Sequence, residues 1–132
     1  MRLSSVRRAG SSLERAYVDV NVLYYYLTAH PEYGERAKEH LEVYGGLLVT
    51  SSLTVWLLHV LTKLEGLSTI LEELGVELAP LDAGIVREAE RLERPRDFED
   101  RLHLATARRL GVRVILSNDR DFDGIPGITR VF

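Results

Sequence analysis

Residues 112–117, Val-Arg-Val-Ile-Leu-Ser, form the stretch that decides the fold of this chain. β-branched and long apolar residues dominate it, Gly111 precedes it and turn-forming residues follow it, which together predict a strand. A second stretch, residues 16–22 with the sequence Ala-Tyr-Val-Asp-Val-Asn-Val, is apolar on both sides of Asp19. Such a strand is typical of a sheet covered on both faces, so we expect it near the centre of the sheet.

Helical and extended patterns alternate along the rest of the chain. The expected helices span residues 23–27, 31–44, 53–64, 68–74, 82–94 and 98–110, and the further strands span residues 47–50, 76–81 and 128–132. Each connection between strands is too long for a hairpin, which favours parallel pairing with helices on both faces. The sequence therefore predicts an α/β protein, a three-layer α/β/α sandwich around a mainly parallel central sheet.

Length and composition bound the class of protein. The 132 residues suffice for one domain, expected over residues 16–132, whereas residues 1–15 carry four arginines against one glutamate and predict a mobile basic N-terminal arm. No run approaches ~18 apolar residues and none follows the basic start, so neither a membrane span nor a secretory signal is expected. The lack of cysteine fits a reducing cytoplasm, and the net charge of −3 argues against a protein that coats nucleic acid by charge alone.

Three aspartates are expected to meet at one edge of the sheet. Asp19 ends the first strand, Asp119 comes directly after the strand at residues 112–117, and Asp100 lies one turn into the helix at residues 98–110. In an open parallel sheet, ligands bind beyond the carboxyl ends of the strands. Converging carboxylates repel one another unless a cation is present, and Mg²⁺ and Mn²⁺ prefer such oxygen ligands. Because a cation held there turns a bound water into a nucleophile for phosphodiester hydrolysis, the trio is a candidate metal and catalytic site.

Each aspartate also has a purely structural interpretation. Asp19 suits a helix cap, Asp100 suits the first turn of a helix where the dipole favours an acid, and Asp119 suits a turn before Gly124. The Asp-x-Asp-x-Asp-Gly run that starts at Asp119 also matches half of an EF-hand loop, but Arg130 occupies the twelfth position, where that loop needs Glu. The joint placement of the three acids is what favours a catalytic site.

Three motifs in this sequence resemble the acidic motifs of PIN-domain proteins. They are Tyr17-Val-Asp-Val-Asn-Val-Leu, Asp97-Phe-Glu-Asp-Arg-Leu-His-Leu-Ala-Thr-Ala and Leu116-Ser-Asn-Asp-Arg-Asp-Phe. In order and spacing they are most similar to those of the small VapC-type toxins of toxin–antitoxin pairs. The resemblance implies the same α/β/α sandwich and cleavage of RNA that depends on Mg²⁺ or Mn²⁺. It maps the catalytic, metal-binding acids of the family onto Asp19, Asp100 and Asp119, with Asn21 and Asp121 as supporting cofactor-binding residues.

The resemblance also implies partners for the chain. Members of this family usually form homodimers. A cognate antitoxin protein holds them inactive, and a segment of that antitoxin occupies the acidic groove.

One departure from the family pattern concerns the helix at residues 53–64. The family normally carries a Glu near residues 55–58, whereas this chain has no carboxylate between Glu42 and Glu65. Glu65 lies about two turns beyond that position, roughly 11–12 Å along the axis at ~1.5 Å per residue. His59 offers a nitrogen, although a histidine on an apolar helix is more often packed. With one acid fewer, we expect weaker cation binding and a one-ion or weakened nuclease.

The same helix is apolar nearly all round. Such a helix is either buried on several sides or shared with another chain. Together with Tyr24, Tyr25 and Tyr26, it is a candidate surface for a homodimer or for an antitoxin.

Two other functions stay open from the sequence. A binding module with a decayed acid site would explain the missing Glu, although decay gives no reason to retain all three aspartates. A phosphatase of the haloacid dehalogenase type also starts with Asp at the end of a first strand. Its Asp-x-Asp motif, however, reads Asp19-Val-Asn here, and Lys63 lies in the wrong helix.

Overall fold

The central sheet joins strands that are far apart in the sequence. In the computed structural model, which describes residues 13–132, five strands pair in the order β3-β2-β1-β4-β5, and all four pairings are parallel. The strands are β1 (Ala16–Val18), β2 (Leu48–Ser51), β3 (Glu77–Ala79), β4 (Val114–Leu116) and β5 (Thr129–Val131). The strand expected near the centre is β1, with β2 on one side and β4 on the other. The predicted α/β class is confirmed, and the sheet is parallel throughout.

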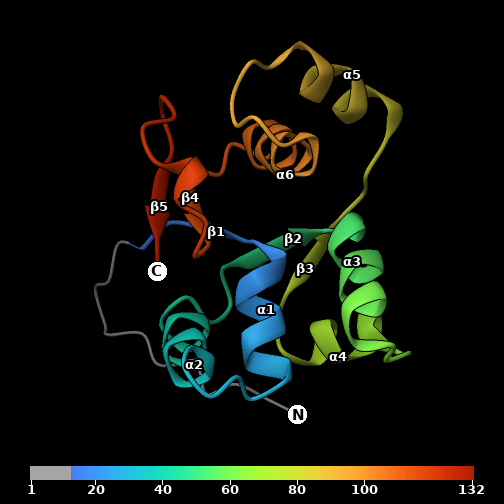
Figure 1. The fold of residues 1–132 in the computed structure, drawn as a ribbon, viewed down its shortest axis with the longest axis vertical. Coiled ribbons are helices and arrows are strands. Elements are labelled where there is room, and N and C mark those ends of the chain that lie inside the picture. Colours follow the sequence, from blue (N-terminus) through green and yellow to red (C-terminus); the bar gives the residue numbers. More distant parts are fainter. Residues whose placement is uncertain (1–12) are drawn as a thin grey trace.

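Helices cover both faces of this sheet, as predicted (Figure 1). Helices α1 to α4 pack on one face, α6 covers the other, and α5 packs against α6. Their bounds are α1 (Val20–Leu27), α2 (Gly34–Val43), α3 (Ser52–Thr62), α4 (Leu67–Glu73), α5 (Ala83–Arg91) and α6 (Phe98–Arg109), with a 3₁₀ turn, η1 (Arg120–Phe122), after β4. Within residues 13–132, no helix combines the length and apolar character needed to cross a bilayer.

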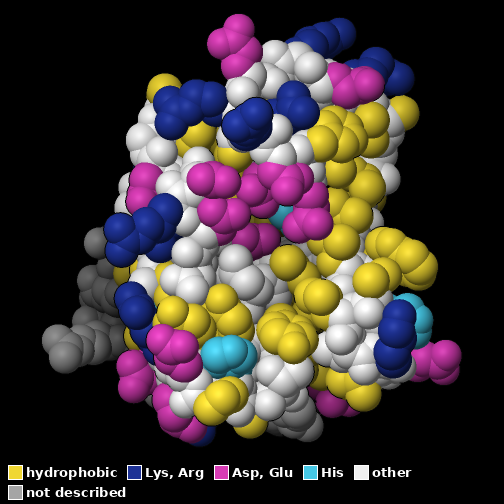
Figure 2. All heavy atoms as spheres, viewed as in Figure 1, with side chains coloured by type: hydrophobic (Ala, Val, Ile, Leu, Met, Phe, Trp, Pro, Cys, Tyr) yellow, Lys and Arg dark blue, Asp and Glu magenta, His cyan; other side chains and the backbone are white. Residues whose placement is uncertain are grey.

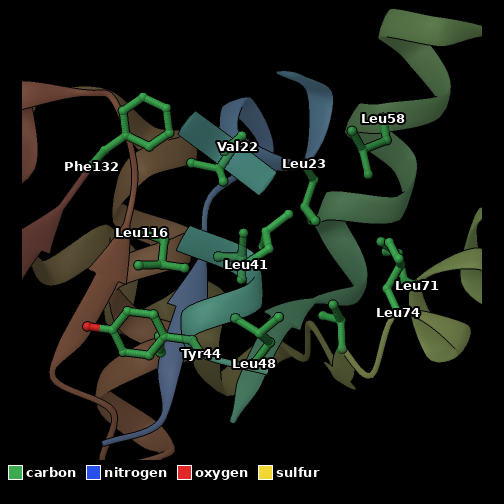
Figure 3. Packing of buried hydrophobic residues seen from close by; sticks show 14 of the residues in the cluster. Val22, Leu23, Leu41, Tyr44, Leu48, Leu58, Leu71, Leu74, Leu116 and Phe132 are labelled. Atoms are coloured by element: carbon green, nitrogen blue, oxygen red, sulfur yellow. The ribbon is translucent and has the colours of Figure 1, made fainter. Parts of the chain in front are cut away.

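Alternate residues of the central strands supply two separate cores. Val18 and Leu116 belong to the larger core under α1 to α4 (Figure 3), whereas Tyr17 and Ile115 pack with Leu104 under α6. All five side chains are fully buried. This two-sided burial explains why the sequence of these strands is apolar throughout rather than alternating.

The start of α2 differs from the prediction. The helix expected from residue 31 begins at Gly34, because the His30 imidazole Nδ1 accepts hydrogen bonds from the backbone N–H groups of Glu32 and Tyr33, both at 3.1 Å. These bonds hold residues 31–33 as turns before the helix starts.

The end of α5 is also earlier than expected. The helix predicted to reach residue 94 ends at Arg91, and Leu92 is extended, with φ −76° and ψ 139°. The Leu92 carbonyl accepts a hydrogen bond at 2.8 Å from the Arg101 guanidinium of α6, a partner outside α5 that satisfies this group at the end of the helix.

The predicted basic arm lies largely outside the described residues. Of its fifteen residues only the last three are described. Glu14 forms an ion pair with Arg113 at 2.5 Å, and Arg15 forms one with Glu77 of β3. The described end of this segment is therefore attached to the sheet.

Substitutions at two leucines of α3 test which face of this helix is buried in the core and which is exposed. Leu58 is fully buried in the larger core, whereas Leu61 is 55% exposed. Leu58→Ala is expected to lower the free energy of unfolding by about 2–4 kcal/mol, because it removes packed apolar atoms and leaves a cavity. Leu61→Ala, the matched control, should change it by no more than ~0.5 kcal/mol. Urea denaturation at low nanomolar protein, where a contact between two copies through α3 would be dissociated, measures both, and equal losses would contradict the assigned orientation of α3.

Candidate metal centre

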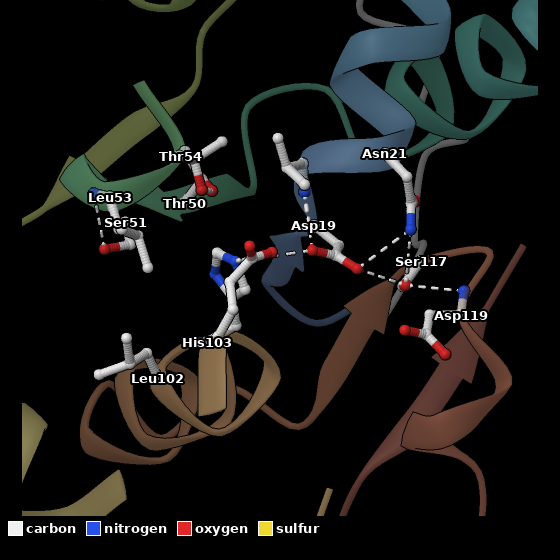
Figure 4. A network of polar contacts seen from close by, with 12 residues as sticks. Asp19, Asn21, Thr50, Ser51, Leu53, Thr54, Leu102, His103, Ser117 and Asp119 are labelled. Atoms are coloured by element: carbon white, nitrogen blue, oxygen red, sulfur yellow. Dashed lines mark hydrogen bonds and ion pairs between the residues drawn. The ribbon is translucent and has the colours of Figure 1, made fainter. Parts of the chain in front are cut away.

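The carboxyl ends of β1 and β4 place the first and last predicted acids at one edge of the sheet. The two strands are adjacent and parallel, with Val18 opposite Leu116. The backbone N–H of Asp19 donates to the Leu116 carbonyl at 2.9 Å, so Asp19 lies beside the segment that leads to Asp119. Figure 4 shows Asp19 between His103 of α6 on one side and Ser117 on the other.

Asp19 is a buried carboxylate with several hydrogen bonds. It is only 2% exposed and caps α1, where its Oδ1 accepts from the Val20 N–H at 2.8 Å. Its Oδ2 accepts from the Ser117 hydroxyl at 2.6 Å and from the Asn21 amide at 3.2 Å. Burial raises the pKa of Asp19, while His103, the Ser117 hydroxyl and the Val20 N–H oppose that rise. The cap also explains why α1 begins at Val20, earlier than residue 23.

Asn21 ties α1 to the segment after β4. Its amide nitrogen donates to Asp19, and its Oδ1 accepts from the Asn118 N–H at 3.2 Å. The Ser117 hydroxyl also accepts from the Asp119 N–H at 3.0 Å, so one set of hydrogen bonds holds both acids (Figure 4). Both polar atoms of the Asn21 side chain are thus engaged within the protein, in a positioning role.

Asp100, Asp119 and Asp121 form one group of possible ligands. Asp97 caps α6 and places Asp100 in its first turn, where Asp100 is 6% exposed. Asp119 caps η1 and accepts from the Asp121 N–H at 2.9 Å. One carboxylate oxygen from each of Asp100, Asp119 and Asp121 lies within 4.8 Å of the others. Burial, the negative charges of Asp19 and Asp119 and a hydrogen bond with Asp119 raise the pKa of Asp100 to about 8.

Asp19 belongs to a second group of possible ligands. Its partners there are Glu99 and His103 of α6, with one ligand atom of each residue within 4.8 Å of the others. The three predicted aspartates therefore lie at one edge of the sheet, where the charges of Asp19 and Asp119 both raise the pKa of Asp100. They belong to two different groups of possible ligands, however, with Asp19 in one and the other two in the second. Sequence reasoning missed Glu99 and His103, although their spacing of four residues places them on one face of a helix.

The acids at this edge have little compensating positive charge. Among residues 13–132, no ion pair joins Asp19, Asp100, Asp119 or Asp121 to a lysine or arginine. Figure 2 shows acidic side chains gathered in one patch near the middle of this face. Oxygen donors with unbalanced negative charge are the set that Mg²⁺ and Mn²⁺ prefer, so the residues present fit a hard divalent cation.

Residues 55–58, where the resemblance leads us to expect the family's Glu, lie in α3 and carry only apolar side chains. Leu57, our best match to that Glu, is half-buried, and Glu65 is exposed beyond the end of the helix. His59 stacks on Trp56 and its Nδ1 contacts the Leu64 carbonyl at 2.8 Å. In the described part of the chain, neither Glu65 nor His59 joins either group of possible ligands.

Fold and site together define an α/β protein with a carboxylate-rich centre at the carboxyl edge of a parallel sheet. The family model of the PIN domain matches residues 16–128, and the chain belongs to the PIN domain family. A search of curated proteins returns no match.

Solved structures share this fold at low sequence identity. A toxin–antitoxin complex from Klebsiella pneumoniae has a TM-score of 0.70 and 23% identity, covering 86% of this chain and 95% of that one. VapC20 from Mycobacterium tuberculosis, a sarcin–ricin loop cleaving toxin, has a TM-score of 0.71 and 17% identity, and the match covers 86% of this chain and 98% of that one. VapBC2 from Rickettsia felis, bound to a DNA fragment from its promoter, has a TM-score of 0.62 and 16% identity, and the match covers 88% of this chain and 96% of that one.

The raised pKa of Asp100 predicts how the stability of the metal-free protein depends on pH. The folded protein keeps this proton up to about pH 8, whereas the unfolded chain loses it near pH 4. Between these values the folded state binds more protons, so the free energy of unfolding should fall as pH rises. Asp100→Asn should flatten this fall and stabilise the metal-free protein at pH 8 by ~2 kcal/mol, after allowance for solvent screening.

Asp123→Asn is the matched control for this measurement. The Arg130 guanidinium holds the pKa of Asp123 below its usual range, so this change should remove stability at neutral pH instead of adding it. Thermal unfolding in chelator from pH 5 to pH 8 measures both variants. A slope unchanged by Asp100→Asn would contradict the assigned pKa of Asp100.

Proposed function

We propose that this chain is a cytoplasmic endoribonuclease that depends on Mg²⁺ or Mn²⁺, and that it is the toxin of a toxin–antitoxin pair. The observation that carries the proposal is the set of uncompensated carboxylates where β1 and β4 end. Membership of the PIN domain family supports it, as do structural neighbours described as a toxin–antitoxin complex and as a toxin that cleaves the sarcin–ricin loop.

In the proposed site, Asp100 and Asp119 would hold the cation, with Asp19 completing the ligand set from the neighbouring group and Asp121 as an outer ligand. A cation bound there would polarise a water for attack on an RNA phosphodiester and would stabilise the leaving oxygen. Ser117 and Asn21 hold the carboxylate of Asp19 in one orientation, which limits its movement during the reaction.

Protonation and phosphate binding involve further side chains of the same edge. Asp100 carries its proton up to about pH 8 in the metal-free protein, so it must release that proton when the cation binds. The exposed side chains of Arg96 and Arg120 flank the site in sequence, before Asp100 and after Asp119, and are suited to steer the phosphate backbone.

The exposed face of α3 is proposed as the homodimer surface. In α3 only Thr54 and Leu58 are buried, whereas Trp56 is 62% and Leu61 is 55% exposed. Figure 2 shows hydrophobic side chains gathered over the α3 region, beside the acidic patch. Large exposed apolar patches with aromatic residues are typical of protein interfaces. We propose that a basic segment of the antitoxin binds the acidic patch beside it, because the opposite charges are complementary.

A binding module without turnover is the second candidate function. The observation that favours it is the absence of a carboxylate at residues 55–58, where the resemblance leads us to expect a Glu and where Leu57 is our best match to it. The same assay separates the two functions.

RNA cleavage in Mn²⁺ tests the proposed function. Asp100→Asn should lower the rate on a panel of structured RNAs on the order of 10²–10³-fold, because it removes a proposed carboxylate ligand of the cation. Asp123→Asn, in the same acidic region but paired with Arg130, should cleave like the wild type. Leu57→Glu should raise the rate if the missing carboxylate limits turnover. Residual cleavage that is equal in the wild type and Asp100→Asn would favour the binding module.

The mass in solution tests the proposed dimer. One chain has a mass of 15.0 kDa, so light scattering at micromolar concentration should give twice that, 30 kDa. Trp56→Asp should reduce the mass to that of one chain, because it places a charge in the centre of the apolar face. Phe98→Asp, at an exposed aromatic residue of α6, is the matched control and should leave the dimer intact. A wild type that is monomeric would contradict this assignment of the α3 face.

A further inference from the structure

One buried nitrogen at the acidic edge lacks a hydrogen-bond partner. The His103 side chain is fully buried, and its Nε2 makes no hydrogen bond with any group of residues 13–132. This nitrogen lies 3.7 Å from Asp19 Oδ1 and 3.7 Å from Glu99 Oε2. Both distances are too long for a hydrogen bond but leave space for an atom that all three groups could contact. Buried polar atoms are rarely left without a partner, so this one requires an explanation.

The orientation of the imidazole is fixed from its other side. His103 Nδ1 lies 2.5 Å from the hydroxyl oxygen of Tyr17, a buried residue of β1. When Nδ1 carries the ring proton, it donates to this hydroxyl, and the lone pair of Nε2 then faces Asp19 and Glu99. Histidine ligands in metal sites are held in the same way, by donating their second ring N–H to a fixed acceptor.

We propose that Asp19, Glu99 and His103 bind a second divalent transition-metal cation, with Mn²⁺ as the representative ion. Two carboxylate oxygens and one imidazole nitrogen suit Mn²⁺ or Zn²⁺ better than Mg²⁺, which prefers oxygen ligands alone. A cation there would give Nε2 the partner that it lacks and would balance the charge of Asp19. The inference deepens the proposed function, because it explains how a chain without the helix Glu still supplies a second group of ligands.

The arrangement of the three residues supports binding from solvent. Glu99 lies one turn before His103 on the same face of α6, and its side chain is 39% exposed. Asp19 and His103 are buried behind it, with side chains 3% and 0% exposed. Glu99 is therefore the ligand of this group that a cation from solvent would meet first.

Pulsed electron paramagnetic resonance of the full chain with Mn²⁺ tests this site directly. Modulation from a coordinated ¹⁴N nucleus should appear in the wild type and should change frequency when histidine is labelled with ¹⁵N, which needs no substitution in the core. His103→Gln should abolish it. Asp119→Asn alters only the other group and should retain it. Glu99→Gln, at a partly exposed position, should weaken Mn²⁺ binding to the nitrogen site ~10–100-fold.

The outcomes separate this inference from the proposed function. Mn²⁺ that binds without nitrogen modulation would overturn the second site and leave the carboxylate group and the proposed nuclease standing. Nitrogen modulation that persists in His103→Gln would assign the signal to another histidine and would also overturn it. No Mn²⁺ binding of any kind would contradict both the second site and the proposed function.

Discussion

Repulsion between carboxylates that the parallel sheet forces together is the constraint on which this site depends. Because β1 and β4 pair in parallel, Asp19 and Asp119 must emerge at the same edge, and α6 adds Asp100 there. Two unit charges 4 Å apart repel by about 4 kcal/mol at the effective dielectric constant of ~20 typical of proteins. The fold limits this cost in two visible ways. Hydrogen bonds from Val20, Ser117 and Asn21 stabilise the charge of Asp19, and Asp100 retains a proton up to about pH 8.

The same constraint links stability to ligand binding. The metal-free protein relieves repulsion by protonating Asp100, whereas a bound cation would relieve it with positive charge and displace that proton. A basic segment of a partner could relieve it in the same way. The protonated, the cation-bound and the partner-bound protein are thus each more stable than an empty site with every carboxylate ionised. Because a cation and a basic partner segment would both neutralise the same carboxylates, they should compete for this site.

Much of this organisation could be predicted from the sequence, because it depends on local pattern. The apolar stretches around Asp19 and before Asp119 predicted two strands of the sheet. Because both acids follow such a strand, the pattern also predicted that they lie at the same edge. Element ends were predicted less well. The start of α2 depends on the imidazole of His30, and the end of α5 depends on Arg101, a residue ten positions beyond Arg91. Side chains that act across such distances leave no local signal.

The division of the acids into two groups was also beyond the sequence. It depends on the orientation of α6 about its own axis. That orientation places Glu99 and His103 near Asp19, and it places Asp100 near Asp119 and Asp121. The motif that carries Asp100 contains both missed residues, but only the structure shows that His103 contacts Tyr17 of β1. The apolar character of α3 likewise predicted either burial or an interface, and the exposure of Trp56 favours the interface.

Calorimetric titration with Mn²⁺ tests the central claim, that carboxylates gathered at this edge hold a divalent cation. The wild type should release or take up heat on binding, and Asp19→Asn and Asp119→Asn should each weaken the affinity by ~10-fold or more. Asp123→Asn, whose carboxylate is paired with Arg130, should bind like the wild type. Affinity that is unchanged by both Asp19→Asn and Asp119→Asn would contradict the account.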